Sequence, residues 1–266
     1  MMRSIVFVLL VSLALSKTIM PWMCLERCKE DIPADLKQIA SLDDLLTDVS
    51  FEEFDLDWGA RLKHNGFTKV SHFIEAHKLG TQPMITTVNI AKLTELFAST
   101  ASMDFFIEQI VEVAKKNNYT GINIDFEPSG QEAFPLADGY VEFVDRLAKA
   151  LHKFNKVCSI DIARWSQFWN YKKLAATEVD FFCEMSTYAG AMSNFKTALY
   201  NAMEYFGDRA VIGLISVNPN TGKLFTDQDM AERFALIREV GAKGIAIWQS
   251  PIPANFIPLL KEFKKW

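Results

Sequence analysis

The stretch YTGINIDFEP at residues 119–128 decides the fold expected of this chain. Side chains alternate between the two faces of a β-strand, so Asn123, Asp125 and Glu127 share one face. The opposite face is apolar and carries Ile122, Ile124 and Phe126. Pro128 has no backbone N–H to give to a sheet, so it ends the strand directly after Glu127. The pattern predicts a strand whose polar face ends in a carboxylate.

Two kinds of sheet could hold such a strand. A half-exposed antiparallel strand also alternates polar and apolar residues. Helical patterns stand on both sides, however, at residues 104–116 and 139–154. A helix between two strands is typical of parallel βαβ units, so we favour the parallel arrangement. In that case the apolar face packs against helices and the polar trio points into the interior.

Short apolar runs alternate with helical patterns along the rest of the chain. The predicted strands lie at residues 47–54, 83–88, 121–127, 157–163, 179–187, 210–216 and 244–248, with a weaker candidate at 67–70. The predicted helices lie at 104–116, 139–154, 194–205, 227–240 and 255–265. This alternation is typical of an α/β fold, and we predict a single-domain (β/α)8 TIM barrel. A doubly wound open sheet is the alternative, although no glycine-rich phosphate-binding turn follows the first strand.

The segment between residues 216 and 244 is short. It leaves no room for a folded module inserted between the seventh and eighth strands of the barrel. We therefore expect a shallow, open cleft at this end of the barrel.

The first residues, MMRSIVFVLLVSLALS at 1–16, predict a secretory signal peptide. Arg3 precedes an apolar stretch, and Ala14-Leu15-Ser16 has the small residues of a cleavage site. A membrane anchor is the alternative, but the apolar run is shorter than the about 20 residues that span a bilayer. We therefore expect a protein that is secreted or enters a lysosomal or vacuolar lumen, without stable membrane insertion.

The four cysteines fall into two groups. Cys24 and Cys28 belong to the motif CLERC and could bridge locally or tether the N-terminus elsewhere, since secretion permits disulfides. A zinc site is disfavoured because no further ligands lie nearby. Cys158 and Cys183 lie in predicted strands, where buried free thiols are the favoured interpretation.

The predicted organisation has three parts. They are the signal peptide at 1–16, an N-terminal segment with the cysteine pair at 17–40, and the barrel at 41–266. Asn118-Tyr119-Thr120 is an N-glycosylation acceptor motif, so a secreted form would be a glycoprotein.

Composition narrows the range of functions. The chain has 266 residues, of which 50% are hydrophobic, so it can bury a substantial core. It has 28 basic and 33 acidic residues, a net charge of −5 and no long basic run, so no nucleic-acid partner is expected. With four histidines, a metal centre is disfavoured, and we expect no metal and no cofactor.

The polar face of the strand at 121–127 points to acid–base chemistry. In a barrel, Glu127 would lie at the C-terminal mouth, where active sites form. Asp125 and Glu127 would lie about 6–7 Å apart along the backbone on one inner face. Each carboxylate disfavours ionisation of the other, which raises one pKa. A glutamic acid that stays protonated near neutral pH can act as a general acid.

Gly121-x-Asn123-x-Asp125-x-Glu127 resembles the catalytic strand signature of glycoside hydrolase family 18. That family contains chitinases, chitobiases and endo-β-N-acetylglucosaminidases, together with lectin-like relatives. The usual signature has an aspartate where this chain has Asn123, and an asparagine there resembles the chitobiase branch. The CLERC motif resembles that of short secreted relatives.

Other segments resemble the family in order along the chain. Residues 82–88 occupy the place of the third strand but lack its usual Gly-Gly. Residues 180–188 resemble the sixth-strand motif, with Thr187 at its tyrosine position and Tyr188 at the aspartate that follows. Residues 245–249 resemble the eighth strand, whose tryptophan corresponds to Trp248 and forms the floor of the sugar site.

The resemblance implies substrate-assisted, retaining hydrolysis, an exception to the usual two-carboxylate schemes. Glu127 would protonate the glycosidic oxygen while the 2-acetamido carbonyl of the substrate attacks the anomeric carbon. Asp125 would orient the acetamide, and Asn123 would hydrogen-bond to Asp125. Tyr188 would hold the acetamide oxygen, and Thr187 is the less favoured candidate.

Further residues are predicted to contact substrate. The set comprises Trp248, Asp161, Met185, Thr187 and Trp165. Trp248 would stack on the apolar face of the sugar. Asp161 shares its strand face with Ser159 and Ala163, so it could face Glu127. A core-packing role is the alternative for each tryptophan.

Three functions compete. The favoured one is a glycosidase acting on β-linked N-acetylglucosaminides, of the chitooligosaccharide or N-glycan core type. The expected partner is then an N-acetylglucosamine-containing oligosaccharide or glycan, bound by a monomer. A non-catalytic, lectin-like protein on the same barrel is the alternative, motivated by the altered sixth-strand motif and the missing Gly-Gly. A metal-dependent phosphodiesterase barrel is least favoured, because it needs ligands at several strand ends.

Overall fold

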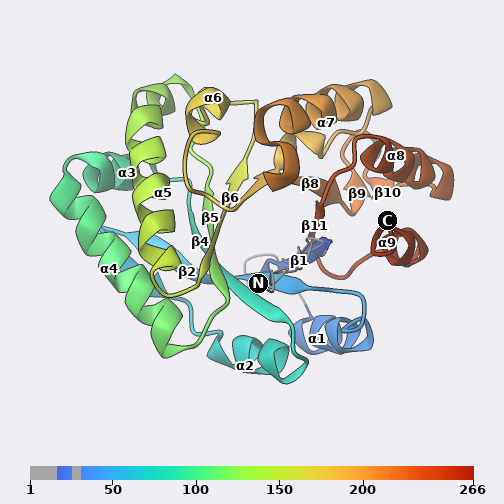
Figure 1. Ribbon diagram of the computed structural model, residues 1–266, viewed down its shortest axis with the longest axis horizontal. Helices are drawn as coiled ribbons and strands as arrows, with labels where there is room; N and C mark the ends of the chain where they lie inside the picture. The colour runs from blue at the N-terminus through green and yellow to red at the C-terminus, as the bar shows by residue number, and fades with distance from the viewer. Residues whose placement is uncertain (1–16, 26–30) are drawn as a thin grey trace, which may run out of the picture.

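The computed structural model describes residues 17–25 and 31–266. Parallel strands form a closed eight-stranded barrel, because the first strand pairs with both the second and the last. Figure 1 shows the strands at the centre and the helices around them. The barrel strands are β1 (Thr18–Met23), β2 (Asp48–Asp57), β4 (Gly80–Thr87), β5 (Gly121–Phe126), β6 (Val157–Ile162), β7 (Phe181–Glu184), β8 (Ala210–Ile215) and β11 (Gly244–Trp248). The predicted TIM barrel is therefore confirmed.

Helices connect the strands and cover the outside of the barrel. They are α1 (Ile32–Ser41), α2 (Thr68–Ala76), α3 (Ile90–Phe97), α4 (Thr100–Lys116), α5 (Ala137–His152), α6 (Tyr171–Leu174), α7 (Met192–Phe206), α8 (Asp227–Glu239) and α9 (Phe256–Phe263). Short 3₁₀ turns add η2 (Gln131–Leu136), η3 (Met185–Thr187) and η4 (Gly207–Arg209). Among the described residues, no helix is both long and apolar enough to cross a membrane.

Three further short strands lie outside the barrel wall. β3 (Arg61–His64) pairs antiparallel with the end of β2, and β9 (Val217–Asn218) forms a hairpin with β10 (Lys223–Leu224). The segment between β8 and β11 consists of this hairpin and α8, in agreement with the short connection expected there.

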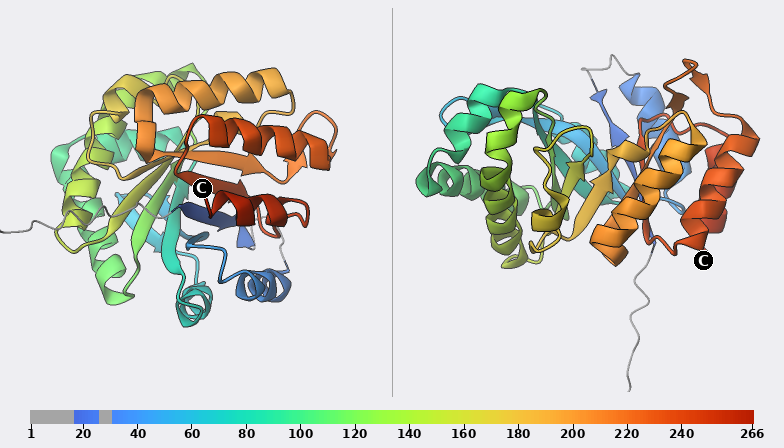
Figure 2. Two further views of the ribbon diagram at one scale, coloured as in Figure 1. Left: turned by 45° about the vertical axis from the view of Figure 1, so that its right-hand side comes forward. Right: turned by 90° about the horizontal axis from the view of Figure 1, so that it is seen from above.

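The first barrel strand lies in a part of the chain where the sequence predicts none. β1 falls within 17–40, ahead of the barrel start expected at residue 41. Pro21 within this strand argues against a central strand, because it cannot donate to the sheet. In the structure Pro21 nevertheless lies opposite Ile247 of β11, and Figure 2 shows the dark blue first strand beside the dark red last strand.

The weak strand candidate at residues 67–70 is wrong, because α2 begins there, at Thr68. Its β-forming residues are overridden by packing, since Val70 and Ile74 lie one helical turn apart and are both buried against the core.

The outward faces of the strands form the main hydrophobic core with the helices. Ile122, Ile124 and Phe126 are fully buried there. The ring of Phe126 stacks on that of Phe143 from α5, with 5.8 Å between the ring centroids. The apolar face of β5 therefore packs against a helix, as its alternation predicts.

The inward faces hold a small apolar cluster and a chain of buried polar groups. The cluster contains Met20, Trp22, Met84, Cys183, Val211 and Ala246. In the polar chain, Ser159 Oγ donates to Gln82 Oε1 at 2.9 Å, and Gln82 Nε2 donates to Asp48 Oδ1 at 3.0 Å. Buried polar groups are costly without partners, so this chain fixes the orientation of the inner side chains.

The cysteines divide as the sequence suggests. Cys158 and Cys183 are free and buried, which confirms the favoured interpretation. Cys24 is disulfide-bonded. Cys28 and the predicted signal peptide at 1–16 lie outside the described residues.

Candidate active site

The C-terminal ends of the barrel strands surround a cavity of about 210 Å³. Three carboxyl groups meet in it: Asp125 from β5, Glu127 directly after β5, and Asp161 from β6. The remaining wall is mostly apolar and consists of Trp22, Trp165, Met185, Tyr188, Ile215 and Trp248. Lysine, arginine and histidine are absent from these lining residues, so no cation of the wall offsets the acidic groups.

Asp125 is buried and hydrogen-bonds to Glu127. Its Oδ1 atom has no hydrogen-bond partner, so this oxygen is free to accept a bond from a ligand. Burial raises the pKa of Asp125 well above its ordinary value, and the negative charges of Glu127 and Asp161 raise it further. Both the hydrogen bond and the raised pKa of Asp125 favour one proton shared between the two carboxyl groups.

Asp161 is only 2% exposed and is held by two donors. Asn123 Nδ2 donates to Asp161 Oδ1 at 3.1 Å, and the Cys183 thiol donates to the same carboxyl group. Burial raises the pKa of Asp161 well above its ordinary value, while the bond from Asn123 opposes this shift. The structure thus places Asp161 beside Glu127, as the strand alternation predicts.

Asn123 supports Asp161 rather than Asp125, which corrects the hydrogen bond expected from the sequence. One amide hydrogen of Asn123 is directed at Asp161 and the other at Ser159 Oγ, 3.1 Å away. Its Oδ1 atom lies 3.5 Å from Ser50 Oγ. An amide has two hydrogens, so none remains for Asp125.

Tyr188, and not Thr187, reaches the cavity. Thr187 Oγ1 lies 2.5 Å from the Glu184 carbonyl oxygen and 2.7 Å from that of Gly213, so its hydroxyl bonds to the backbone. The Tyr188 hydroxyl is buried without a partner. Burial raises the pKa of Tyr188 well above its ordinary value, and the negative charge of Asp161 raises it further. Thr187 is therefore not a cavity residue, contrary to expectation, whereas the Tyr188 hydroxyl can donate a hydrogen bond to a bound group.

Aromatic rings form most of the apolar wall. Trp22 contacts Trp248 and Tyr188 edge-on, with ring centroids 6.3 Å and 6.4 Å apart. Trp165 is 58% exposed at the rim and packs edge-on against the buried Trp169. Trp22 was missed in the sequence because its strand was missed; a bulky aromatic near the end of the run TIMPW was the available signal.

The loop that carries Met185 and Tyr188 is held from behind by Glu184. This carboxylate is fully buried and accepts bonds from Tyr171 Oη at 2.6 Å and from the Ser186 backbone N–H at 2.8 Å. Burial raises the pKa of Glu184, while these donors oppose the shift. Glu184 points away from the cavity, so its role is to fix the loop.

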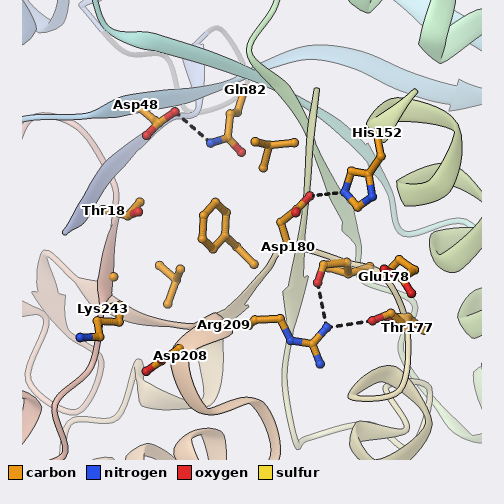
Figure 3. Close-up of a pocket in the computed structure, with 15 residues that line it drawn as sticks. Thr18, Asp48, Gln82, His152, Thr177, Glu178, Asp180, Asp208, Arg209 and Lys243 are labelled. Carbon is orange, nitrogen blue, oxygen red and sulfur yellow. Dashed lines mark hydrogen bonds and ion pairs between the residues drawn. The ribbon is translucent and has the colours of Figure 1, made fainter. Parts of the chain in front are cut away.

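A second, larger cavity of about 560 Å³ opens where the strands begin (Figure 3). His152 Nε2 lies 2.9 Å from Asp180 Oδ2. Arg209 donates to the carbonyl oxygens of Thr177 and Val179 at 2.8 Å and 3.0 Å. These polar groups are occupied by one another, and barrel active sites form at the opposite, C-terminal ends of the strands. The smaller cavity is therefore the candidate active site.

Within residues 17–25 and 31–266, no group of three or more histidine, cysteine, aspartate or glutamate side chains is arranged to hold a metal ion.

Known proteins are similar to this chain in family and fold. A family model described as glycosyl hydrolases family 18 matches residues 87–235, which is more than half of the chain and includes the strand with Asp125 and Glu127. Comparison with curated protein sequences gives no match.

Several solved structures share the fold at low sequence identity. A chitinase from Chromobacterium violaceum is 13% identical with a TM-score of 0.78, and the match covers 93% of this chain and 98% of that one. The spore cortex-lytic enzyme SleL from Bacillus megaterium is 14% identical with a TM-score of 0.78, covering 91% and 73%. A class V chitinase from Pseudomonas fluorescens is 17% identical with a TM-score of 0.76, covering 92% and 99%. At these identities the likeness concerns the fold.

Proposed function

The chain belongs to glycosyl hydrolases family 18, and on this basis we propose that it hydrolyses β-linked N-acetylglucosaminides. The observation that carries the proposal is the meeting of Asp125, Glu127 and the unpartnered Tyr188 hydroxyl in one apolar cavity. The proposed substrates are chitooligosaccharides or the N-acetylglucosamine core of N-glycans.

Glu127 is the proposed general acid. It lies at the end of β5, is less buried than Asp125, and hydrogen-bonds with it. It gives the shared proton to the glycosidic oxygen as the bond from that oxygen to the anomeric carbon breaks. The 2-acetamido carbonyl oxygen of the substrate attacks the anomeric carbon from the other side, so the intermediate is an oxazolinium ion of the sugar itself.

Asp125 and Tyr188 hold the acetamide group during this attack. The free Oδ1 of Asp125 accepts the acetamide N–H, and the Tyr188 hydroxyl donates to the acetamide oxygen. Negative charge on Asp125 stabilises the positive oxazolinium ion. In the second step water attacks the anomeric carbon, its proton returns to the Glu127–Asp125 pair, and the acetamide is released with retention of configuration.

The aromatic wall provides the sugar-binding surface. Trp248 supplies a face on which the apolar side of a pyranose ring stacks, and Trp22 supports it edge-on. A hollow of about 660 Å³ adjoins the cavity and shares Ile215 and Trp248 with it. This neighbouring space supports a substrate longer than one sugar unit.

We also propose that the protein is secreted or enters a lysosomal or vacuolar lumen, which the signal peptide expected at 1–16 supports, and that it is a monomer. Asn118 of the glycosylation motif is exposed in the turn after α4, which is compatible with modification.

The decisive experiment is hydrolysis of chitotetraose and of a high-mannose glycoprotein by the purified wild type and by Glu127→Gln. Loss of a general acid lowers the rate by about 10²- to 10⁴-fold, and this is the expected effect. Glu132→Gln, a change at an exposed carboxylate five positions along the chain, is the matched control and should keep full activity.

Two results would count against this function. Equal activity of Glu127→Gln and wild type removes Glu127 from the mechanism. Binding of chitooligosaccharide by calorimetry, with no turnover by the folded wild type, favours the non-catalytic carbohydrate-binding alternative instead.

A further inference from the structure

We propose that Asp161 is a positioning residue: its negative charge makes the Asp125–Glu127 pair hold a proton at neutral pH. This role replaces the substrate contact expected for Asp161 from the sequence. It rests on the proposed function, because the proton held by the pair is the one delivered to the glycosidic oxygen.

Asp161 and Asp125 stand side by side on neighbouring strands. Asn123 lies opposite Ser159, and Ile124 lies opposite Ile160. The same register places Asp125 next to Asp161, and adjacent strands lie about 4.8 Å apart. Both carboxyl groups face inward and line the same cavity.

The hydrogen bonds around the two aspartates are unequal. Asp161 receives the amide hydrogen of Asn123 at 3.1 Å and the thiol hydrogen of Cys183. One oxygen of Asp125 has no hydrogen-bond partner, and its carboxyl group is hydrogen-bonded to that of Glu127. Donors stabilise the charged form of a carboxyl group, so the negative charge of the cluster settles on Asp161.

The groups around this charge are acidic or neutral. They are Asp125 of β5, Glu127 directly after it, Cys183 of β7, Tyr188 after η3, Tyr140 of α5, and Glu52 of β2, whose charge acts on Asp125. The nearest cation along the chain, Arg164, acts on Glu184 instead.

If the Asp125–Glu127 pair lost its proton, a second negative charge would lie close to that of Asp161 in a poorly solvated cavity whose wall has no cation. Charge repulsion is strong under these conditions. The Asp125–Glu127 pair therefore keeps its proton to a higher pH than it would beside a neutral residue.

The direct test is Asp161→Asn, which keeps the size of the side chain and an oxygen to accept the Asn123 bond. The measurement is kcat/KM for chitotetraose from pH 4 to pH 9. A general acid must be protonated, so activity falls when the pair loses its proton. We expect the alkaline limb of the profile to move about one pH unit lower, with activity at acidic pH kept within a few fold.

Two further variants separate charge from structure. Cys183→Ala removes one donor to Asp161 and should move the limb in the same direction by less, and Cys183→Ser should restore the wild-type limb by supplying a hydroxyl donor. Asp138→Asn is the matched control, because this exposed carboxylate of α5 pairs with Lys173 at 2.6 Å, away from the cavity. Its profile should match that of the wild type.

Other outcomes overturn the proposal. An unchanged limb with a large fall in kcat at all pH values would make Asp161 catalytic. A raised KM alone would make it a substrate-binding residue.

A second readout does not depend on activity. Buried carboxyl groups with raised pKa values destabilise the fold as the pH rises, because they resist ionisation. The Tm of Asp161→Asn should therefore fall less than that of the wild type between pH 4 and pH 8. If the wild type shows no turnover, the proposed hydrolysis is contradicted, but the Tm comparison can still be made. If the Tm values of the wild type and Asp161→Asn change with pH in parallel, the proposed role of Asp161 is contradicted.

Discussion

The Tyr188 hydroxyl is buried in the candidate site without a hydrogen-bond partner. An unpaired buried hydroxyl costs about 1–3 kcal/mol of stability unless a ligand supplies the partner. Tyr188→Phe should therefore keep or slightly raise the Tm, while lowering kcat/KM on chitooligosaccharides by about 10- to 1000-fold through loss of the acetamide bond. Thermal unfolding and steady-state kinetics on the same samples check both effects.

Thr187→Val provides the comparison at the adjacent position. The Thr187 hydroxyl bonds to backbone carbonyl oxygens and not to the cavity, so its removal should lower the Tm with a smaller effect on kcat/KM. If Thr187→Val instead lowers kcat/KM strongly and Tyr188→Phe does not, Thr187 and not Tyr188 holds the acetamide.

Alternation along the sequence predicts some cavity residues and fails for others, and the reason is the local backbone geometry. Asp125 and Asp161 lie within regular strands, where side chains alternate strictly, and both face the cavity as predicted. Thr187 and Tyr188 follow the end of β7, where the 3₁₀ turn η3 breaks the alternation. Counting along a strand cannot assign inward and outward positions past that point. The partner of Asn123 was also beyond prediction, because it depends on the register of β5 with β6.

Among the elements, β1 shows where local sequence carries too little information. Its partners are Gly244–Ile247 near the other end of the chain and the start of β2, so its pairing is entirely non-local. Strand preference depends on such packing more than on the residues of the strand itself. The remaining barrel strands are located by their own apolar runs, although the sequence predicts no helix at α2, between β2 and β4, or at α6, between β6 and β7.

The loop containing η3 depends on one buried carboxylate, which gives a test at the level of this element. Tyr171 Oη donates to Glu184 Oε2 at 2.6 Å, and Tyr171→Phe leaves that buried oxygen without its donor. We expect the free energy of unfolding to fall by about 1–3 kcal/mol. We also expect kcat/KM to fall by a few fold, because Met185 follows Glu184 directly and Tyr188 lies in the same short loop.

Tyr200→Phe is the matched control for this change. Its hydroxyl donates to Glu239 at 3.0 Å on the exposed surface. Loss of a surface bond changes stability by less than about 0.5 kcal/mol. Equal losses of stability in the two variants would show that the buried hydrogen bond to Glu184 contributes no more to stability than the exposed one to Glu239.

For the whole molecule, the barrel separates two kinds of interior. The outer shell between strands and helices is apolar, while the inside contains a chain of polar contacts from Asp161 through Asn123 and Ser159 to Gln82 and Asp48. This chain links the candidate site to the opposite end of the barrel. The barrel architecture could be predicted because it follows from periodicity, but this polar chain could not, because it depends on which side chains meet across four strands.

A carboxyl group outside the active site also contributes to the pH dependence of global stability. Glu53 of β2 is 1% exposed, and one of its oxygens has no partner. Burial raises the pKa of Glu53 from 4.5 to about 7, although backbone N–H groups of Phe67 and Gly66 oppose the shift. Below pH 4.5 the carboxyl is protonated in both the folded and the unfolded state. As the pH rises from there towards 7, the unfolded state ionises first, so stability is lost.

Glu53→Gln removes this ionisation and should therefore raise the Tm at pH 8, with no comparable gain at pH 4. A shift of this size corresponds to about 3 kcal/mol of unfolding free energy. Urea unfolding at the two pH values measures the difference, and Asp55→Asn, a change at a less buried carboxylate of the same strand, is the control. At pH 4 the Glu53 carboxyl is neutral, so a gain in stability there cannot come from loss of its charge. An equal gain in stability at pH 4 and pH 8 would therefore attribute the effect of Glu53→Gln to packing and contradict the prediction.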